Sequence, residues 1–371
     1  MKILFYTPVK LQSGGGCERW HCDITNSLKK QFGFDIEIIS ANLGYNHWSS
    51  NYLKQQLQKT PYRQLNFPIL FGTIIPTPAI FVFLLKKFRE ADNVHFIHGF
   101  AGQDILIAIL KLLTGKKVVV GHHAPIFHSS KFHNFYMKYV ARFVLKFFDF
   151  HQTLNAQDKI FLEQTWGIKH VYFIPSGVRV GKFLKVKRIK DNGLVFISVG
   201  RYSLQKGFDI ALEAIAKFNE VYKNNDAKFL FIGGGELKPL IQEYSKKNKN
   251  IIDFGYVTYE QIPQLYAKSD IYLLSSREEP FGLVLVEAWS SGIPVLATKT
   301  EGPKDMLKPG INGWFIETVN KDGIFNGIIN IYKNYLSGKS YLDKFELNCR
   351  KTGKLFSIDT TAKRMQSAFF S

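Results

Sequence analysis

The strongest constraint on the fold is an alternation of short apolar runs with helical patterns, which fills the first half of the chain and restarts near residue 194. Each apolar run has the length of a buried strand, and the segments between the runs have helical periodicity. Strand, helix and strand in this order predict a parallel, doubly wound sheet. Because the pattern occurs twice in 371 residues, we expect an α/β protein of two domains.

The expected elements follow from these patterns. In the first half, strands are expected at 3–7, 35–40, 94–97, 118–121, 151–154 and 171–174, and helices at 18–30, 78–89, 103–113, 134–147 and 156–166. In the second half, strands are expected at 194–200, 228–232, 251–254, 271–274, 294–297 and 314–316, and helices at 207–222, 237–246, 259–267, 282–289 and 324–336.

The segment 175–192 has the composition of a linker, with a proline, glycines and six basic residues. We therefore expect two Rossmann-like domains, at 1–178 and 179–354, and a C-terminal helix within 355–371 that packs back on the first domain. Doubly wound sheets bind ligands beyond the carboxyl ends of their strands. Two such domains face to face across a cleft would hold one ligand on each wall, which suggests an enzyme with two substrates.

Charge narrows the class of partner. Lys and Arg number 49 and Asp and Glu 30, a net charge of +19, which indicates an anionic partner such as a phosphorylated ligand, an anionic membrane or a nucleic acid. The excess lies mainly in residues 1–183, which carry 22 basic and 10 acidic residues and all ten histidines.

The cysteines and the apolar runs bear on the compartment. The chain has three cysteines, Cys17, Cys22 and Cys349, and they form no C-x-x-C pair. A disulfide framework and a structural zinc site are therefore not expected, and we expect a cytoplasmic location. The N-terminal apolar run is too short for a signal peptide. Prolines interrupt the longest uncharged run, 64–85, which predicts a loop and a buried helix from near Ala79 rather than a membrane span.

A polar segment at 275–287, SSREEPFGLVLVE, follows one predicted strand and opens a helix. The first amides of a helix and its dipole bind phosphate, and Gly282 lets a ligand approach the backbone. Glu287 is placed to bind a ribose diol, and Glu279 the hydroxyls of a group attached to a diphosphate. Taken alone, the two glutamates are better explained as a helix-start carboxylate and a solvated helix residue.

Neighbouring strand ends change that balance. Arg201 and Lys206 follow the strand that ends at Gly200, and two cations so spaced can clamp a diphosphate. Gly234 lies in a glycine-rich strand exit, IGGGE, and the loop TEGPKDM at 300–306 follows another strand. Because the carboxyl ends of parallel strands meet at one edge of the sheet, these segments together predict a nucleotide-diphosphate site in the second domain.

No metal and no cofactor are predicted. His95, His98 and His128 suggest metal ligands, but no acidic ligand follows at helical spacing, and an Asp-x-Asp pair occurs nowhere in the chain. A structural histidine at a strand end is the better explanation.

The segment 131–150, KFHNFYMKYVARFVLKFFDF, is both basic and aromatic. A helix here would place an apolar face beside a cationic stripe of Lys138, Arg142 and Lys146. Such helices lie at anionic membrane surfaces. They also cover sheets while their charges face water, so both explanations stay open.

The second half resembles the donor domain of the retaining GT-B glycosyltransferases of family 4. The family's E-x7-E signature corresponds to Glu279 and Glu287, with Phe281 and Gly282 between them, and its phosphate-binding cations correspond to Arg201 and Lys206.

The match is imperfect at two places. The interdomain segment FIPSGVRVGKF at 173–183 has Ser176 and Arg179 where the family usually has Asn and Asp. TEGPKDM has Glu301 and Asp305 where the family usually has Gly and Glu.

The first half supports the resemblance. The segment SGGGCERW at 13–20 is similar to the family's N-terminal glycine loop, most of all in enzymes that extend lipid-linked oligosaccharides; a tight strand-to-helix turn explains the same residues. In VVVGHHAP, His123 fits the family's histidine near the donor sugar better than His122 does, and a satisfied loop histidine is the alternative.

The resemblance implies a role for each residue. The cations Arg201 and Lys206 would stabilise the departing diphosphate, Glu287 would hold the ribose, Glu279 would orient sugar hydroxyls and His123 would contact the donor sugar. The nucleotide-sugar contacts would include Gly200, Gly234 and Phe281, with backbone amides from Gly15, Gly16, Gly282 and Leu283. No protein nucleophile and no metal is implied.

The sequence and its resemblance thus predict a retaining glycosyltransferase that moves a hexose from a UDP- or GDP-linked donor to a glycan or lipid-linked acceptor. Mannose and glucose are the favoured hexoses. It would be cytoplasmic, with peripheral membrane attachment if the basic aromatic helix binds lipid. One alternative is a GT-B nucleotide-sugar epimerase; a phosphorylase is disfavoured because nothing marks a pyridoxal-phosphate lysine. A nucleic-acid-binding protein would explain the charge but not the strand-end loops, so no nucleic-acid partner is predicted.

Overall fold

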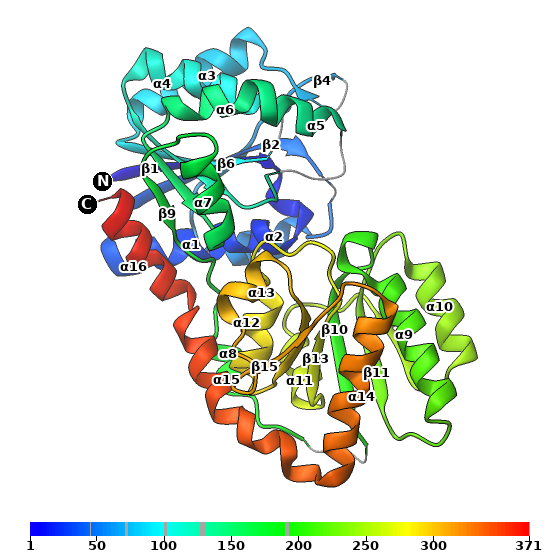
Figure 1. Ribbon diagram of the computed structural model, residues 1–371. Helices are drawn as coiled ribbons and strands as arrows, with labels where there is room; N and C mark the ends of the chain where they lie inside the picture. Colours follow the sequence, from blue (N-terminus) through cyan, green and yellow to red (C-terminus); the bar gives the residue numbers. More distant parts are fainter. Residues whose placement is uncertain (45, 71–72, 100–101, 127–130, 190–192, 371) are drawn as a thin grey trace. The chain divides into compact units, whose positions relative to one another are not determined.

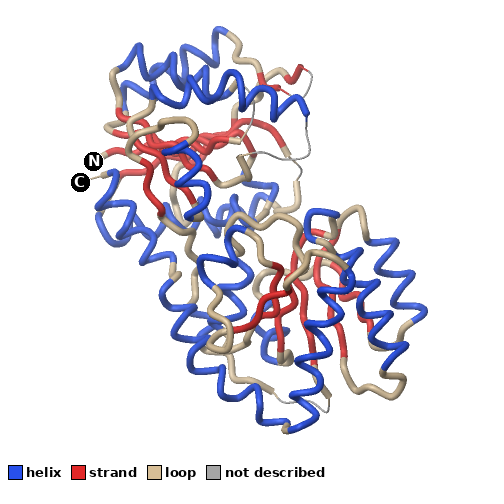
Figure 2. Tube along the Cα trace, viewed as in Figure 1, coloured by secondary structure: helices blue, strands red, loops and turns tan. Residues whose placement is uncertain are grey.

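The computed structural model describes residues 1–44, 46–70, 73–99, 102–126, 131–189 and 193–370. The chain forms two units, Met1–Gly177 with Ile358–Ser371, and Val178–Ser357. Each unit is built on one parallel sheet with helices on both faces, as Figures 1 and 2 show. The prediction of two Rossmann-like α/β domains is therefore confirmed.

The first unit has a seven-stranded parallel sheet in the order β3-β2-β1-β6-β7-β8-β9. Its strands are β1 (Lys2–Val9), β2 (Asp35–Leu43), β3 (Tyr62–Gln64), β6 (Asn93–His98), β7 (Lys117–His122), β8 (Phe150–Thr153) and β9 (Val171–Phe173). A short antiparallel pair, β4 (Ile69–Leu70) and β5 (Thr73–Ile74), lies apart from this sheet.

Helices cover both faces of this sheet because alternate strand residues point to opposite sides. From β1, Leu4 and Tyr6 pack in one core, and Ile3 and Phe5 in the other. The first core is closed by α3 (Pro78–Glu90), α4 (Gln103–Thr114), α5 (Lys131–Tyr136), α6 (Arg142–Val144) and α7 (Ala156–Gln164). The second is closed by α1 (Gly16–Phe32), α2 (Ser50–Leu57) and α16 (Ile358–Phe369).

The second unit has a six-stranded parallel sheet in the order β12-β11-β10-β13-β14-β15. Its strands are β10 (Val195–Arg201), β11 (Lys228–Gly234), β12 (Ile251–Gly255), β13 (Ile271–Leu274), β14 (Val295–Thr298) and β15 (Gly313–Ile316). Its helices are α8 (Gly181–Leu184), α9 (Phe208–Val221), α10 (Lys238–Lys247), α11 (Ile262–Ala267), α12 (Leu283–Ser290), α13 (Glu301–Met306), α14 (Lys321–Ser337) and α15 (Asp343–Leu355).

Strand order in the second unit reverses between β10 and β13, because the chain adds β11 and β12 on one side of β10 and then crosses to the other. Doubly wound sheets bind ligands at such a switch point, beyond the carboxyl ends of the strands. The fold therefore places a ligand site where the segments after residues 201 and 274 meet.

The expected loop at 300–306 is wrong, because these residues form α13. The Gly-Pro pair resembles a turn signal, but Pro303 lies in the first turn of the helix, where its missing N–H is not needed. Gly302 approaches the backbone of Phe281 so closely that a Cβ on it would lie 2.3 Å from the Phe281 oxygen. Tertiary packing against the segment before α12 therefore decides this helix.

The helix expected at 134–147 is present, but it begins at Lys131 and is not one regular α-helix. The segment is α5, a π-helical turn η2 (Met137–Ala141), α6 and a 3₁₀ turn η3 (Leu145–Phe147) in succession. Helical hydrogen bonding thus continues but changes its step. The helix α3 begins near the expected position but buries only Leu84 and Phe88, so the expectation of a buried helix there is met on one side only.

Besides α13, the elements that were not expected from the sequence include α2, β3, β4, β5, α8 and α15. The described part of the chain contains no helix that is long and apolar enough to cross a membrane.

The C-terminal helix α16 packs on α1 in the first unit, where Ser27 Oγ donates to Asp359 Oδ1 over 2.6 Å. Its start lies against Gly177, because a Cβ on that glycine would lie 2.6 Å from both Ile358 Cα and Thr361 Oγ1. The Thr361 hydroxyl also donates to the Pro175 carbonyl over 3.0 Å.

We predict that Gly177→Ala destabilises the protein by about 1–3 kcal/mol, since overpacking against backbone atoms cannot be relieved by a rotamer change. Urea unfolding followed by circular dichroism measures this. Gly181→Ala is the matched control, because no atom lies within 4 Å of its added Cβ. Equal midpoints for the two variants would contradict the packing argument.

Candidate functional site

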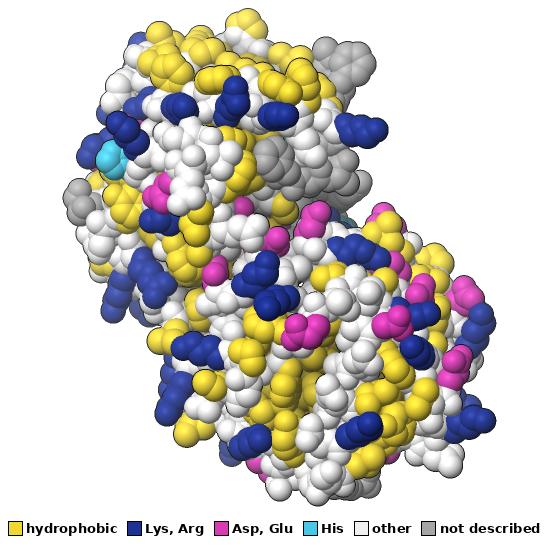
Figure 3. Space-filling model, viewed as in Figure 1, with side chains coloured by type: hydrophobic (Ala, Val, Ile, Leu, Met, Phe, Trp, Pro, Cys, Tyr) yellow, Lys and Arg dark blue, Asp and Glu magenta, His cyan; other side chains and the backbone are white. Residues whose placement is uncertain are grey.

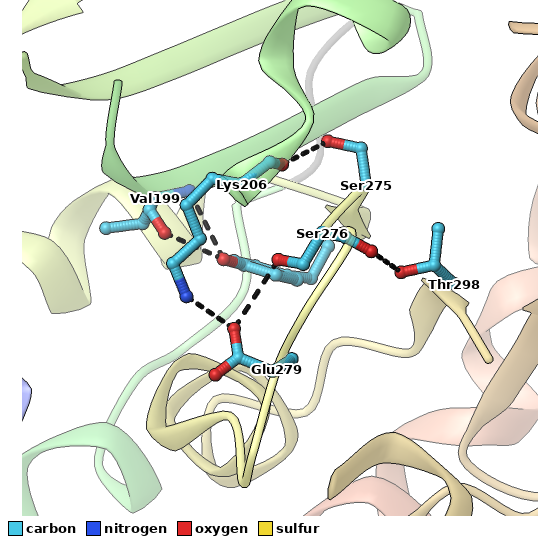
Figure 4. Close-up of polar contacts among 7 residues, drawn as sticks. Val199, Lys206, Ser275, Ser276, Glu279 and Thr298 are labelled. Atoms are coloured by element: carbon cyan, nitrogen blue, oxygen red, sulfur yellow. Dashed lines mark hydrogen bonds and ion pairs between the residues drawn. The ribbon is translucent and has the colours of Figure 1, made fainter. Parts of the chain in front are cut away.

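Lys206 and Glu279 form an ion pair at the point where the strand order of the second unit reverses. Lys206 ends the short turn η4 (Leu204–Lys206) after β10, and Glu279 lies between β13 and α12. The Lys206 Nζ lies 2.5 Å from Glu279 Oε2, and the two side chains are 24% and 9% exposed (Figure 4). A buried carboxylate and a cation that solvent still reaches make a site for an anionic, hydroxyl-bearing ligand.

Hydrogen bonds fix the backbone on both sides of Glu279. The Gly302 N–H donates to the Glu279 carbonyl over 2.8 Å. The Thr298 hydroxyl donates to the Ser276 carbonyl over 2.6 Å, and Ser276 Oγ lies 3.5 Å from Glu279 Oε2 (Figure 4). The carboxylate is therefore oriented by the end of β14 as well as by its own loop.

The turn that carries Lys206 is closed onto the end of β13. Ser275 Oγ donates to the Lys206 carbonyl over 2.9 Å (Figure 4). The next residue, Gly207, has a φ of +65°, and a Cβ there would lie 2.0 Å from the main-chain carbonyl oxygen of Ser275. Only glycine fits this approach, which is why the sequence has the short Lys-Gly step before α9.

Tyr272 lies beneath the ion pair. Its hydroxyl donates to the Val199 carbonyl over 2.9 Å and accepts from the Val199 N–H over 3.3 Å. Burial raises the pKa of Tyr272 well above its usual value, and the negative charges of Glu279 and Glu287 raise it further. Tyr272 therefore stays protonated and ties β13 to β10 directly below the site.

Glu287 is 2% exposed on α12, so it is not a solvated helix residue. Gly282, at a φ of +94°, precedes this helix, and the first N–H groups of a helix lack an intrahelical acceptor. The predicted phosphate-binding amides of Gly282 and Leu283 thus lie at the start of the helix that buries Glu287. Phe281, also buried, packs its ring near Phe356.

Two more predicted residues end neighbouring strands. Arg201 is exposed at the end of β10 and lies in register with Gly234 of β11. Gly200 pairs with Gly233 one step earlier. A Cβ on Gly234 would meet no atom within 4 Å, so the space over that strand end is open.

The predicted glycine loop of the first unit has an acidic neighbour. Gly15 precedes α1 and Gly16 begins it. The Glu18 carboxylate lies over Gly15, since a Cβ there would be 2.5 Å from Glu18 Oε2. An anion at these amides would meet a like charge, so the structure offers less for phosphate here than at α12.

His123 lies beside Trp20 and His95, with ring centroids 4.3 and 6.5 Å away. Burial lowers the pKa of His123 well below its usual value, and the charges that His95 and His21 would carry lower it further. His123 is therefore neutral at neutral pH. It can exchange hydrogen bonds with a ligand but cannot act as a cation.

His95 and His98 do not form a metal pair, because they lie on opposite faces of β6. The His95 ring stacks on Phe5, and the His98 ring lies near Phe96 and His122. His128 lies outside the described residues. Within the described ranges, no group of three His, Cys, Asp or Glu side chains could hold a metal ion.

The aromatic residues of the segment 131–150 do not share one face of the helix. Tyr136 points into the core, whereas Phe132, Phe135, Tyr139, Phe143 and Phe147 are exposed. Lys138 and Lys146 are exposed and Arg142 is half-buried.

Sequence reasoning missed Tyr272, Ser276 and Thr298. Tyr272 lies within an apolar strand, and a serine or threonine at a strand end carries no signal of its own. Only the pairing of β10, β13 and β14 brings these three side chains beneath the two charged residues.

Comparison with known proteins finds similarity that is strongest in the second unit. Residues 181–354 match the family described as Glycosyl transferases group 1. Mannosylfructose-phosphate synthase of Agrobacterium fabrum is 25% identical over 218 residues, 53% of this chain and 47% of that protein. UDP-Gal:alpha-D-GlcNAc-diphosphoundecaprenol alpha-1,3-galactosyltransferase of Escherichia coli is 29% identical over 194 residues, 48% of each chain. The chain thus spans about half the length of these curated relatives.

Among solved structures, Anabaena Alr3699/HepE in complex with UDP and glucose is similar over the full length of both chains, with a TM-score of 0.77 and 18% identity. This likeness shows the fold, which is GT-B: two Rossmann-like domains.

The buried histidines predict a loss of stability in mild acid. Burial lowers the pKa of His21 to about 4 and that of His95 to about 3. In the unfolded chain these histidines bind protons near pH 6.5, whereas in the folded protein they do so only near pH 4 or below. The free energy of unfolding is therefore highest above pH 6.5, and it falls as the pH drops from 6.5 toward 4. Each histidine removes up to about 1.4 kcal/mol per pH unit.

Urea midpoints measured from pH 7.5 to 5 check this prediction. His95→Phe keeps the ring stack on Phe5 but removes one titrating group. It should therefore flatten the slope by about one proton. A midpoint that does not change between pH 7 and 5 would contradict the burial argument.

Proposed function

We propose that this protein is a retaining glycosyltransferase that moves a hexose from a UDP- or GDP-linked sugar to a glycan or lipid-linked acceptor. Mannose and glucose are the favoured hexoses. The observation that carries the proposal is the Lys206–Glu279 pair at the switch point of a group 1 glycosyl transferase domain. One cation and one carboxylate there suit the two halves of a nucleotide sugar, the diphosphate and the sugar hydroxyls.

Charge is the first requirement of such a reaction. When the bond between the sugar and the diphosphate breaks, negative charge grows on the departing phosphate. Lys206 and Arg201, after the same strand, would stabilise that charge, and the amides of Gly282 and Leu283 would add the field of the helix start. A preorganised donor of this kind contributes about 2–4 kcal/mol to the transition state.

The ion pair also couples the two ligand groups. In the structure, Lys206 is paired with Glu279. A diphosphate would take part of the Lys206 charge, so the Glu279 carboxylate would be released to accept hydrogen bonds from sugar hydroxyls. Ser276 Oγ, near the carboxylate, and the Gly302 amide, on the main-chain carbonyl of Glu279, would hold this residue in place meanwhile. Glu287, buried on α12, would bind the ribose diol.

For the first unit we propose that His123 contacts the donor sugar as a neutral hydrogen-bonding group. The structure offers no cation at this histidine, since burial keeps it unprotonated. No protein nucleophile is proposed. The acceptor would attack on the face from which the diphosphate leaves and pass its proton to the departing phosphate, which keeps the anomeric configuration.

Names of similar proteins support the choice of donor and acceptor classes. HepE was solved with UDP and glucose, and the Escherichia coli relative acts on an acceptor with a diphosphoundecaprenol group. The alternative is a GT-B nucleotide-sugar epimerase. A release of free epimerised sugar in the absence of any acceptor would favour it.

We predict that Glu279→Gln, Arg201→Ala and Lys206→Ala each lower the rate of sugar transfer by about 30- to 1,000-fold, equivalent to about 2–4 kcal/mol. Thermal unfolding shows whether each variant is folded. Lys217→Ala is the matched control, because Lys217 forms a comparable ion pair with Asp322 on an exposed surface of the same unit. Transfer at the wild-type rate in all three variants would refute the site.

Donor choice is tested by thermal stabilisation with a panel of nucleotide sugars. A donor present at 100 times its Kd stabilises the fold by about 2.7 kcal/mol. The stabilising donor should lose its effect in Lys206→Ala and keep it in Lys217→Ala.

We also propose that the transfer needs no metal, since two cations and a helix start can neutralise the diphosphate and the chain has no Asp-x-Asp pair. Activity should therefore survive EDTA. The initial rate, measured with and without chelator, decides the matter. Complete loss that Mg²⁺ or Mn²⁺ restores would show that a metal holds the diphosphate.

A further inference from the structure

The first unit exposes an apolar surface that its own core does not use. It spans three helical segments: Val82 on α3; Ile105, Ile109, Leu112 and Leu113 on α4; and Phe132, Phe135, Tyr139, Phe143 and Phe147 on the segment from α5 to η3. We call these ten residues the outer face. Figure 3 shows hydrophobic side chains gathered over α3, α4 and α6, with Lys and Arg among them.

Covering the sheet does not explain these side chains. In the segment from α5 to η3, the residues that pack on the sheet are Tyr136, Met137, Ala141 and Leu145, each 8% exposed or less. In α4 they are Leu106, Ile107 and Leu110. The helices are thus apolar on both sides, and the aromatic residues are surplus to the core.

The π-helical turn brings the exposed aromatic residues before and after it closer to one line. Phe135, Tyr139, Phe143 and Phe147 recur every four residues, which is longer than the 3.6 residues of an α-helical turn, so in a regular helix they would drift around the axis. The turn η2 has a wider step and takes up part of that drift. The four rings are 49–60% exposed, which fits one continuous ridge.

α4 and α5 are held together beneath this ridge. The Tyr136 hydroxyl donates to the Asp104 carboxylate, and both residues are buried. Burial and the Asp104 charge raise the pKa of Tyr136 above its usual range, so the bond persists at neutral pH. The exposed residues of both helices are therefore presented by one fixed element.

The charge around the ridge is of one sign. The sequence 102–148 contains seven Lys or Arg residues and one acidic residue, Asp104, which is buried. Lys138 and Arg142 lie over the rings of Tyr139 and Phe143, at 5.2 and 4.5 Å from the ring centroids. A cation thus precedes an exposed ring at each of these two turns.

We propose that the outer face docks the first unit on an anionic lipid bilayer, with the aromatic rings in the headgroup layer and Lys131, Lys138, Arg142 and Lys146 on lipid phosphates. Helices with an aromatic and aliphatic face bordered by Lys and Arg lie in that layer. A protein partner fits less well, because protein interfaces are depleted in lysine, and three of the four cations are lysines. The proposal is independent of the proposed transfer activity.

Sedimentation with vesicles tests this proposal without an activity assay. The wild-type protein should sediment with vesicles of phosphatidylcholine and phosphatidylglycerol and much less with phosphatidylcholine alone. Replacing Lys138, Arg142 and Lys146 together by Glu should lower the partition coefficient about 100-fold, from about 1 kcal/mol for each basic residue near the surface. The control is Lys246, Lys249 and Lys333 to Glu, an equal change of charge at exposed sites of the other unit.

A second pair of measurements separates insertion from simple charge attraction. Phe135→Ser with Phe143→Ser keeps every charge and should still lower binding at least tenfold. Phe143→Trp adds an indole on the ridge, and lipids brominated in the acyl chain should quench the added fluorescence only in anionic vesicles.

Three outcomes would overturn the proposal: no sedimentation of the wild-type protein with anionic vesicles at low salt, an equal loss in the control triple variant, or a protein that forms dimers without lipid and loses them in the Phe135 and Phe143 variant. The last would mean that a second copy covers the outer face.

Discussion

The direction of the strands is the constraint on which the second unit depends. In a parallel sheet the carboxyl ends of all strands lie at the same edge. Residues far apart in the sequence therefore lie close together there, although no local sequence pattern shows that they are neighbours. At the switch between β10 and β13, the turn after β10 lies against the end of β13. Lys206 and Glu279, 73 residues apart, form their ion pair there.

A charge pair in a partly buried position is costly unless its other hydrogen-bonding needs are met. Here the surrounding contacts are polar and local: the Gly302 amide on the Glu279 carbonyl, Ser276 near the carboxylate, and Ser275 on the turn of Lys206. Tyr272 joins the two strands below. The arrangement holds a cation and a carboxylate close together. A ligand that carries both a phosphate and hydroxyl groups can therefore contact the cation with the one and the carboxylate with the other.

The first unit is unusual in the apolar side chains that it exposes. Its helices fill two cores and still carry aromatic side chains outward, beside lysines and with no exposed acidic residue from 102 to 148. Apolar exposure of this kind costs solubility unless something covers it. Anionic lipid and a diphosphate, the two partners that we propose, would each be attracted by part of the chain's excess of positive charge.

The sequence by itself determined the two sheets, the strand ends that carry Arg201, Lys206 and Glu279, and the resemblance to group 1 glycosyltransferases, because strand and helix periods and glycine positions are local signals. Only the tertiary structure decided that Glu287 is buried, that Tyr272, Ser276 and Thr298 lie beneath the ion pair, and that 301–306 is a helix. It also decided which aromatic residues of 131–147 face the core. These facts depend on which segments pack together, and burial is a property of the packed chain rather than of any stretch of it.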